Sequence, residues 1–253
     1  MSITRQESLS VAGPTARAAA IRLSGVSKSF GRTRVLRDLD LEVEWGDVLA
    51  VVGPNGSGKS TLLKLLATLT RPDEGTVSVA GLDLSRGGQE ARRLMGVVTH
   101  EPLLYEDLTA YENLAFHARM FRLDRAAQRI ESAAERMGVS DRLHQRVSTL
   151  SHGLRKRVSI ARALLHEPRI LLMDEPESGL DQVALRMLES VIADRTDPYR
   201  TVVMTTHNLD RAMESAGSVA VLAQGKIAYR GSLDSVAAES IRDTYVRYTD
   251  GAL

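Results

Sequence analysis

Cysteine is absent from the 253 residues, which excludes disulfides and thiolate metal sites. No apolar run approaches the roughly 20 residues that a membrane-spanning helix needs. The longest runs, such as residues 48–52, have the length of a strand. Lys and Arg number 33 against 32 Asp and Glu, so the formal net charge is only +1 and no basic block stands out. We therefore expect no nucleic-acid partner, and contact with a membrane only through another protein.

The remaining composition, 43% apolar and 26% charged, is that of an ordinary core-forming protein. Residues 1–18 contain Glu7 and no hydrophobic segment, so we expect a disordered tail there rather than a secretory signal. Strands are expected over 21–24, 39–43, 48–52, 76–79, 96–99, 170–173, 201–205, 219–222 and 227–229. Helices are expected over 61–69, from 109 onward, over 125–137, 151–167 and 182–193, and at the C-terminus. Apolar strands that alternate with helices predict a parallel α/β core, and the helix-rich block between them predicts an inserted subdomain.

A glycine-rich segment, residues 53–60, matches the pattern G-x-x-x-x-G-K-[ST] between an expected strand and an expected helix. Glycines let the backbone fold around a triphosphate with its N–H groups pointing inward. Lys59 supplies charge to the β- and γ-phosphates, Ser60 offers a hydroxyl to Mg²⁺, and Thr61 adds a second hydroxyl. A turn without a ligand is the alternative, and the flanking elements argue against it. The predicted nucleotide-binding residues here are Gly53, Pro54, Asn55, Gly56, Ser57, Gly58, Lys59, Ser60 and Thr61.

Two adjacent carboxylates, Asp174 and Glu175, follow the apolar segment 170–173. We assign Asp174 to Mg²⁺ and Glu175 to the attacking water as general base. The alternative is that both acids merely end a strand, but the phosphate loop earlier in the chain favours the functional interpretation. His207 ends another core strand, where we expect it to contact the γ-phosphate, although a lone histidine is more often structural.

The segment Leu150-Ser151-His152-Gly153-Leu154 lies between the phosphate loop and the acidic strand end. With those motifs in this order, the chain resembles the ABC ATPase family over about residues 20–232, and this segment stands where the family has LSGGQ. The resemblance implies that Ser151 and Gly153 bind the γ-phosphate held by the other subunit, through an N-cap hydroxyl and a backbone N–H. An ordinary serine-capped helix is the alternative for the segment in isolation.

The same resemblance assigns three further residues. Asp181 ends Ser178-Gly-Leu-Asp181, the family's D-loop, and is expected at the dimer interface. Phe30, with Val35 beside it, falls where an aromatic ring stacks on adenine. Phe30 as a plain core residue is the alternative. Selectivity that rests on stacking alone would allow GTP as well as ATP.

Two departures from the family pattern involve histidine. His100 stands where the family has the Q-loop glutamine, which reaches the metal and the water and connects to the transmembrane partner. We therefore include His100 among the catalytic and magnesium-binding candidates. His152 and Leu154 replace a glycine and the glutamine of LSGGQ. Because imidazole changes charge near neutral pH, we expect turnover to depend on pH more than in a glutamine-bearing relative.

The resemblance implies a P-loop NTPase core with a mainly parallel sheet, an antiparallel β region and an inserted α-helical subdomain. The expected divisions of a single nucleotide-binding domain, residues 19–253, are an ATP-binding core over 19–88 and 167–232, the helical subdomain over 89–166 and a C-terminal helix over 233–253.

The resemblance also implies an ATPase that uses ATP and Mg²⁺. Two copies would sandwich two ATP molecules and act on integral membrane transporter subunits at the cytoplasmic face of the cell membrane. Residues 150–157 and 161–168 look like the ATPases of bacterial cytochrome c maturation systems, which are described as haem exporters. The alternative is an exporter of drugs, polysaccharides or lipids. A soluble ABC ATPase acting on DNA or ribosomes is a more distant alternative, because no coiled-coil or zinc insertion and no second such domain is present.

Overall fold

The structure, a computed structural model, describes residues 19–194, 196–233 and 238–250. The tail expected over residues 1–18 lies outside them. The strands are β1 (Ala19–Phe30), β2 (Thr33–Glu44), β3 (Val48–Val52), β4 (Glu74–Val79), β5 (Leu82–Asp83), β6 (Met95–Val98), β7 (Ile170–Asp174), β8 (Thr201–Thr206), β9 (Ser218–Ala223) and β10 (Lys226–Ser232). The helices are α1 (Lys59–Leu66), α2 (Leu84–Arg93), α3 (Ala110–Met120), α4 (Ala126–Arg136), α5 (His152–Leu164), α6 (Gln182–Ala193), α7 (Leu209–Ser215) and α8 (Ala238–Asp250), with short 3₁₀ turns over Ser140–Arg142 and Val147–Thr149.

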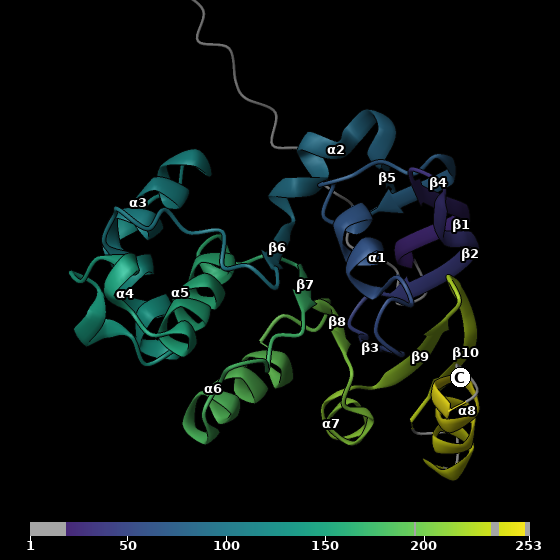
Figure 1. The fold of residues 1–253 in the computed structure, drawn as a ribbon. Helices are drawn as coiled ribbons and strands as arrows, with labels where there is room; N and C mark the ends of the chain where they lie inside the picture. Colours follow the sequence, from purple (N-terminus) through teal and green to yellow (C-terminus); the bar gives the residue numbers. More distant parts are fainter. Residues whose placement is uncertain (1–18, 195, 234–237, 251–253) are drawn as a thin grey trace, which may run out of the picture.

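Two sheets form the core side of the molecule, and α3, α4 and α5 form a separate lobe beside them (Figure 1). The larger sheet has the order β10-β9-β3-β8-β7-β6, in which every neighbouring pair is parallel except β10 with β9. The smaller sheet, β2-β1-β4-β5, is antiparallel. This arrangement confirms the expected fold class, including the antiparallel region and the helical insertion.

The larger sheet is buried on both faces, which explains why its strands read as continuous apolar runs. Alternate residues of β3 face opposite sides: Leu49 and Val51 join a core shared with α1 and the smaller sheet, whereas Val48, Ala50 and Val52 join a core shared with the other helices. The sheet therefore carries its strand ends at one edge between two packed layers, where the loops after β3, β7 and β8 can meet.

The start of α3 is fixed as its sequence predicts. Thr109 and Glu112 form a reciprocal capping box, in which the Thr109 hydroxyl accepts from the Glu112 amide and the Glu112 carboxylate accepts from the Thr109 amide. Among the described residues, no helix is both long and apolar enough to span a membrane.

Several elements differ from the sequence prediction. The antiparallel strands β1 and β2 are longer than expected, and β5, α2 and α7 were not predicted. In α2 the backbone leaves helical geometry at Gly87, which hides its helical pattern. Within the segment expected as the helical subdomain from residue 89, β6 pairs with β7 in the core sheet. The expected division of the domain stays a prediction.

Candidate nucleotide-binding site

The phosphate loop turns from β3 into α1 with two glycines at positive φ. Gly56 has φ 78° and Gly58 has φ 110°, a backbone region that other residues adopt only with strain. A β-carbon at Gly58 would lie 2.7 Å from Leu36 Cδ2, so the loop packs tightly against β2. Asn55 and Gly56, at the tip, are exposed to solvent. The loop therefore packs against β2 on one side and is exposed to solvent at its tip, as binding of a triphosphate requires.

Lys59 is the buried cation of this loop, with 6% of its surface exposed. Its ammonium donates to the Gly53 carbonyl at 2.8 Å and the Pro54 carbonyl at 3.0 Å. Burial lowers the pKa of Lys59, and the charges of Glu175 and Asp174 oppose that shift. The lysine thus holds the loop closed on itself while its charge faces the acidic strand end.

Asp174 lies at the end of β7, 5% exposed, and brings three elements together. Its Oδ1 accepts from the Ser60 hydroxyl at 3.2 Å and from the Thr205 hydroxyl at 2.6 Å. One carboxylate with one hydroxyl suits Mg²⁺, which usually binds few protein oxygens and keeps several waters. Within the described ranges, no group of three or more His, Cys, Asp or Glu side chains could hold a metal. The donors therefore fit a hydrated ion shared with a nucleotide rather than a closed protein cage.

Glu175 and His207 meet at the ends of β7 and β8. Their side chains approach to 3.5 Å between Glu175 Oε1 and His207 Nδ1. Glu175 has φ 43°, an unusual value for a side-chain-bearing residue, and its amide donates to the carbonyl and hydroxyl oxygens of Thr205 at 3.1 and 3.2 Å. These bonds hold the carboxylate beside Asp174 at the mouth of the phosphate loop. Strain at such a position is common at functional sites.

Ser151 caps α5, because its hydroxyl accepts from the Leu154 amide at 3.3 Å. Gly153, in the first turn of the helix, lies so close to another loop that a β-carbon there would come within 2.8 Å of the Gly179 carbonyl. In the described part of the chain, no hydrogen bond or ion pair joins Ser151 or Gly153 to the phosphate loop of the same molecule. Their expected role toward a second subunit stays a prediction.

Asp181 has a structural role within its own chain. Its carboxylate caps α6 by accepting from the Ala184 amide at 2.8 Å, and it forms an ion pair with Arg157 at 2.7 Å. These hydrogen bonds, from the Ala184 amide first and from Arg157, lower the pKa of Asp181. The expected place of Asp181 at a dimer interface is neither required nor contradicted by these contacts.

Phe30 stands at the end of β1 with 52% of its surface exposed, which rules out the alternative that it is a core residue. The Lys28 ammonium lies 5.5 Å from its ring centroid. Val35, half-buried on β2, has its carbonyl 3.2 Å from where a β-carbon of Gly58 would sit. The β1–β2 hairpin therefore borders the phosphate loop and leaves the Phe30 ring free for a flat ligand.

The structure places His100, a predicted catalytic and magnesium-binding residue, near the end of β6. It is exposed, just beyond β6, and among the described residues no hydrogen bond or ion pair links it to Ser60, Asp174 or Glu175. Thr61, by contrast, lies half-buried in the first turn of α1 beside Ser60.

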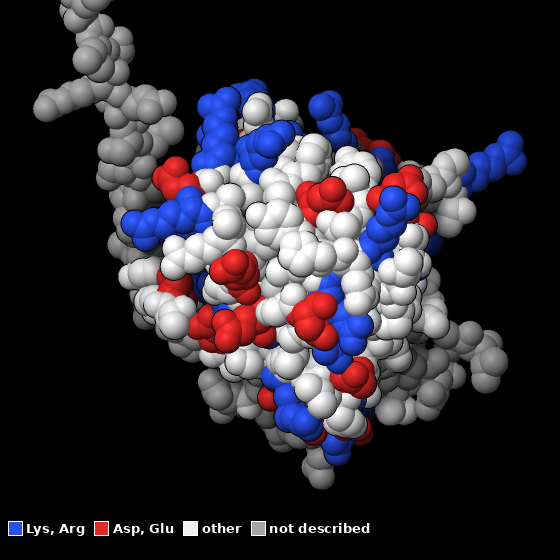
Figure 2. Space-filling view, turned by 90° about the vertical axis from the view of Figure 1, so that its left-hand side faces the viewer, with Lys and Arg blue, Asp and Glu red and all other residues white. Residues whose placement is uncertain are grey.

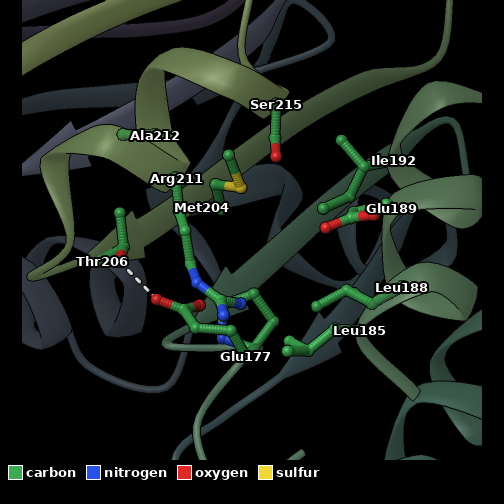
Figure 3. Close-up of a pocket in the computed structure, with 11 residues that line it drawn as sticks. Glu177, Leu185, Leu188, Glu189, Ile192, Met204, Thr206, Arg211, Ala212 and Ser215 are labelled. Carbon is green, nitrogen blue, oxygen red and sulfur yellow. Dashed lines mark hydrogen bonds between the residues drawn. The ribbon is translucent and has the colours of Figure 1, made fainter. Parts of the chain in front are cut away.

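Sequence reasoning missed three residues that support the site. Thr205 binds Asp174, and the Thr206 hydroxyl donates to the Glu177 carboxylate, which ties the segments after β7 and β8 together (Figure 3). Lys156 is buried beneath the same strand ends. No local signal could have found it, because it sits between two arginines in an ordinary charged run.

A cavity of about 30 Å³ lies behind these segments, between β8, α6 and α7 (Figure 3). It has room for about one water molecule and not for a nucleotide. Its lining residues are Pro176, Glu177, Leu185, Leu188, Glu189, Ile192, Met204, Thr206, Arg211, Ala212 and Ser215.

Comparison with known proteins gives consistent matches. The family model described as ABC transporter matches residues 36–178. The ABC transporter ATP-binding protein NatA of Bacillus subtilis is 35% identical over 206 residues, 80% of this chain and 84% of that protein. The daunorubicin resistance ATP-binding protein DrrA3 of Streptomyces coeruleorubidus is 34% identical over 87% of this chain and 71% of its own length. A sulfate/thiosulfate import ATP-binding protein of Synechococcus elongatus is 37% identical over 87% of this chain and 64% of its own length.

Solved structures agree with the fold. The ATP-binding subunit of an ABC transporter superposes with a TM-score of 0.83 at 28% identity, covering 90% of this chain and 99% of that one. A dimeric ATP-binding cassette in a post-hydrolysis state, bound to ADP and Pi, has a TM-score of 0.76 at 25% identity over 84% of this chain and 98% of that chain.

Proposed function

Because the chain belongs to the ABC transporter family as an ATP-binding ATPase, we propose that two copies of it bind and hydrolyse ATP to drive a membrane partner that exports a small organic compound. The observation that carries this proposal is the convergence of Lys59, Asp174 and the Glu175–His207 pair on the carboxyl ends of three parallel strands. Parallel α/β sheets bind their ligands at that edge.

The nucleotide would lie across the loop between β3 and α1. The loop amides and Lys59 would bind the β- and γ-phosphates, and the N-terminal end of α1 would add its positive dipole. Phe30 would stack on adenine, since its ring is exposed beside the loop. The ATP-binding core over 19–88 and 167–232 would then act as one unit, with the helical insertion attached to it.

Ser60 and Asp174 would hold Mg²⁺ between them, in keeping with their 3.2 Å contact. The ion supplies charge neutralisation between the phosphates. His100 would be a further ligand at this position.

Glu175 would accept the proton of the water that attacks the γ-phosphorus. The bond between the γ-phosphorus and the oxygen that bridges it to the β-phosphate would break, which gives ADP and phosphate. His207, at 3.5 Å from Glu175, would orient that carboxylate and contact the γ-phosphate. The strained backbone of Glu175, fixed by Thr205, holds the base in place before the nucleotide arrives.

A second copy would complete each site. Among the described residues, Ser151 and Gly153 form no hydrogen bond with their own phosphate loop, so the N-terminal end of α5 would bind the γ-phosphate held by the partner copy. Asp181 would lie at the interface that this pairing creates. The dimeric solved structure with ADP and Pi supports this arrangement by analogy.

The membrane partner would dock on the helical lobe. A groove of about 390 Å³ there is lined by Leu103, Leu104, Tyr105, Asn113, Phe116, His117, Met120 and Arg162. Four of its apolar residues are exposed, which leaves a surface suited to an amphipathic segment of an integral membrane subunit. The side of the molecule that carries α3 and α4 shows uncharged surface between scattered charges of both signs (Figure 2). The protein would therefore associate peripherally with the membrane.

The haem-export branch expected from residues 150–157 finds no support among the relatives reported above. A drug-resistance relative supports export of a small organic compound, and the sulfate/thiosulfate relative supports import as the second candidate. Co-purification of the membrane partner, followed by substrate-stimulated ATP turnover with an organic cation against sulfate, distinguishes the two.

Replacing Glu175 with Gln tests the hydrolytic assignment. The variant keeps the size and polarity of the side chain but cannot take the proton, so we expect turnover to fall about a hundredfold or more while ATP still binds. ATP-dependent dimers should then accumulate, which size-exclusion chromatography with light scattering would detect. If Glu175→Gln hydrolyses ATP at the wild-type rate, Glu175 is not the general base.

A further inference from the structure

Lys156 is a fully buried cation in the second turn of α5, with 1% of its surface exposed. Its ammonium donates to the Thr99 carbonyl at 3.2 Å and to the Asp174 carbonyl at 3.3 Å. Thr99 lies just after β6, next to His100, and Asp174 ends β7. One side chain therefore connects the helix that begins at Ser151 to the ends of two core strands.

Two further donors extend this connection along the same face of α5. The Ser159 hydroxyl donates to the Pro102 carbonyl at 2.9 Å, and the Arg162 guanidinium donates to the Leu103 carbonyl. Positions 156, 159 and 162 are three residues apart and lie on one side of a helix. They hold the segment 99–103 to α5, and Lys156 additionally reaches the strand that carries the carboxylates.

Burial of an ammonium is unfavourable unless hydrogen bonds and opposite charges compensate for lost water. Lys156 has both kinds of compensation. Burial lowers the pKa of Lys156, while the carboxylates of Asp174, Glu177 and Glu175 oppose that shift. Both acceptors of the Lys156 ammonium are backbone carbonyl oxygens. One belongs to Thr99, next to His100, and the other belongs to Asp174 itself.

We propose that Lys156 is a positioning residue for ATP hydrolysis, one that fixes the end of β7 against the start of α5 and the segment 99–103. The proposal rests on the function assigned above to Asp174 and Glu175. Both hydrogen bonds of Lys156 go to backbone carbonyls, so it acts through the residues that it holds. It fixes the positions of Asp174 and Glu175 relative to Ser151, which would face the partner copy. It also fixes them relative to the segment 99–103, whose Leu103 lines the groove proposed for the membrane partner.

The test compares steady-state ATP hydrolysis by the full chain, in complex with its membrane partner, for Lys156→Met, Lys156→Gln and Ser159→Ala. Methionine keeps the length and apolar stem but donates no hydrogen bond. We expect its kcat to fall about tenfold or more with KM for ATP changed less than about twofold, because misplacement affects the transition state more than nucleotide binding. Glutamine, whose amide can still donate to a carbonyl, should recover part of the lost kcat. Ser159→Ala removes a bond to the same segment without touching Asp174, and its kcat should stay within about twofold of wild type.

Two outcomes would overturn the proposal: an unchanged kcat in Lys156→Met, or a fall in kcat matched by an equal loss of ATP affinity. If Lys156→Met does not fold, Lys156→Leu decides, because leucine also donates no hydrogen bond to the Thr99 and Asp174 carbonyls, and wild-type kcat in that variant overturns the proposal. Glu175→Gln, measured in parallel, separates this proposal from the function it rests on. An inactive Glu175→Gln beside a fully active Lys156→Met refutes only the role of Lys156, whereas an active Glu175→Gln refutes the assigned hydrolytic site.

Discussion

At the scale of single residues, Phe30 is an exposed aromatic ring at the end of a core strand. A phenylalanine at the end of a core strand usually turns inward, yet this ring is half exposed beside the phosphate loop. Val35 and Leu36 fill the space behind the loop, so Phe30 is not needed for packing there. Its exposed face is therefore available to a purine ring.

Replacing Phe30 with Ala should raise KM for ATP about tenfold with little change in kcat, because aromatic stacking on a base is worth roughly 1–3 kcal/mol. Phe30→Tyr, which keeps the ring, is the matched control and should bind ATP as wild type does. Steady-state hydrolysis over a range of ATP and GTP concentrations measures both constants. Equal KM values for Phe30→Ala and wild type would show that adenine lies elsewhere.

Residues of the phosphate loop, Asp174 and Glu175 could be predicted because each motif combines a fixed spacing with residue types that only a few reactions need. Lys156 could not, because its neighbours Arg155 and Arg157 have the same charge and only tertiary packing decides which of the three is buried. His100 was a candidate from its place in the family pattern alone, and its role in the site stays a prediction.

At the scale of elements, two half-buried histidines join α3 to α5 and β6. The ring of Phe121, the residue after α3, lies 4.6 Å from His117 and 4.1 Å from His166, between centroids. His166 also bonds to the Met95 carbonyl on β6 at 3.0 Å. Burial, then the charges of Arg162 and His166, lowers the pKa of His117 to about 3. Burial lowers the pKa of His166 to about 4, against the opposing effect of the Met95 carbonyl.

Both pKa values lie below that of an unfolded histidine, about 6.5. Between these limits the unfolded chain binds more protons than the folded one, so the free energy of unfolding falls as the pH drops from about 6.5 toward about 4, by about 1.4 kcal/mol per pH unit for each histidine. Urea denaturation between pH 4.5 and 6.5 measures the free energy of unfolding. In a His117→Leu, His166→Gln double variant, this free energy should change less per pH unit than in wild type. His144→Gln changes an exposed histidine and should keep the wild-type slope. If the free energy of unfolding changed equally with pH in wild type, the double variant and His144→Gln, the lowered pKa values of His117 and His166 would be contradicted.

Element prediction succeeded where periodicity was long and uninterrupted. The strand over 48–52 and the helix over 182–193 have the predicted bounds. The helix α2 was missed because Gly87 and Gly88 interrupt it, and α7 because seven residues are too few for a periodic pattern. The extent of β1 and β2 was underestimated, since their exposed polar residues break the apolar runs by which strands were recognised.

At the scale of the whole molecule, the proposed site would be shared between two copies. The phosphate loop and the acidic strand ends lie together in one chain, whereas Ser151 caps α5 and, among the described residues, forms no hydrogen bond with them. A single sequence could suggest this only through family resemblance, because nothing in the spacing of Ser151 distinguishes a contact within the chain from one between chains. A composite site makes dimerisation part of the chemistry.

The measurement that tests this central claim most directly is complementation between Lys59→Ala and Ser151→Asp. Lys59→Ala removes the phosphate-binding cation. Ser151→Asp keeps a good N-cap for α5 but points a negative charge at the phosphate of the partner copy. Each variant alone should be nearly inactive. In an equimolar mixture, heterodimers would contain one intact site, so about a quarter of wild-type turnover should return if dimers exchange freely. A mixture no more active than its separate components would contradict the composite site.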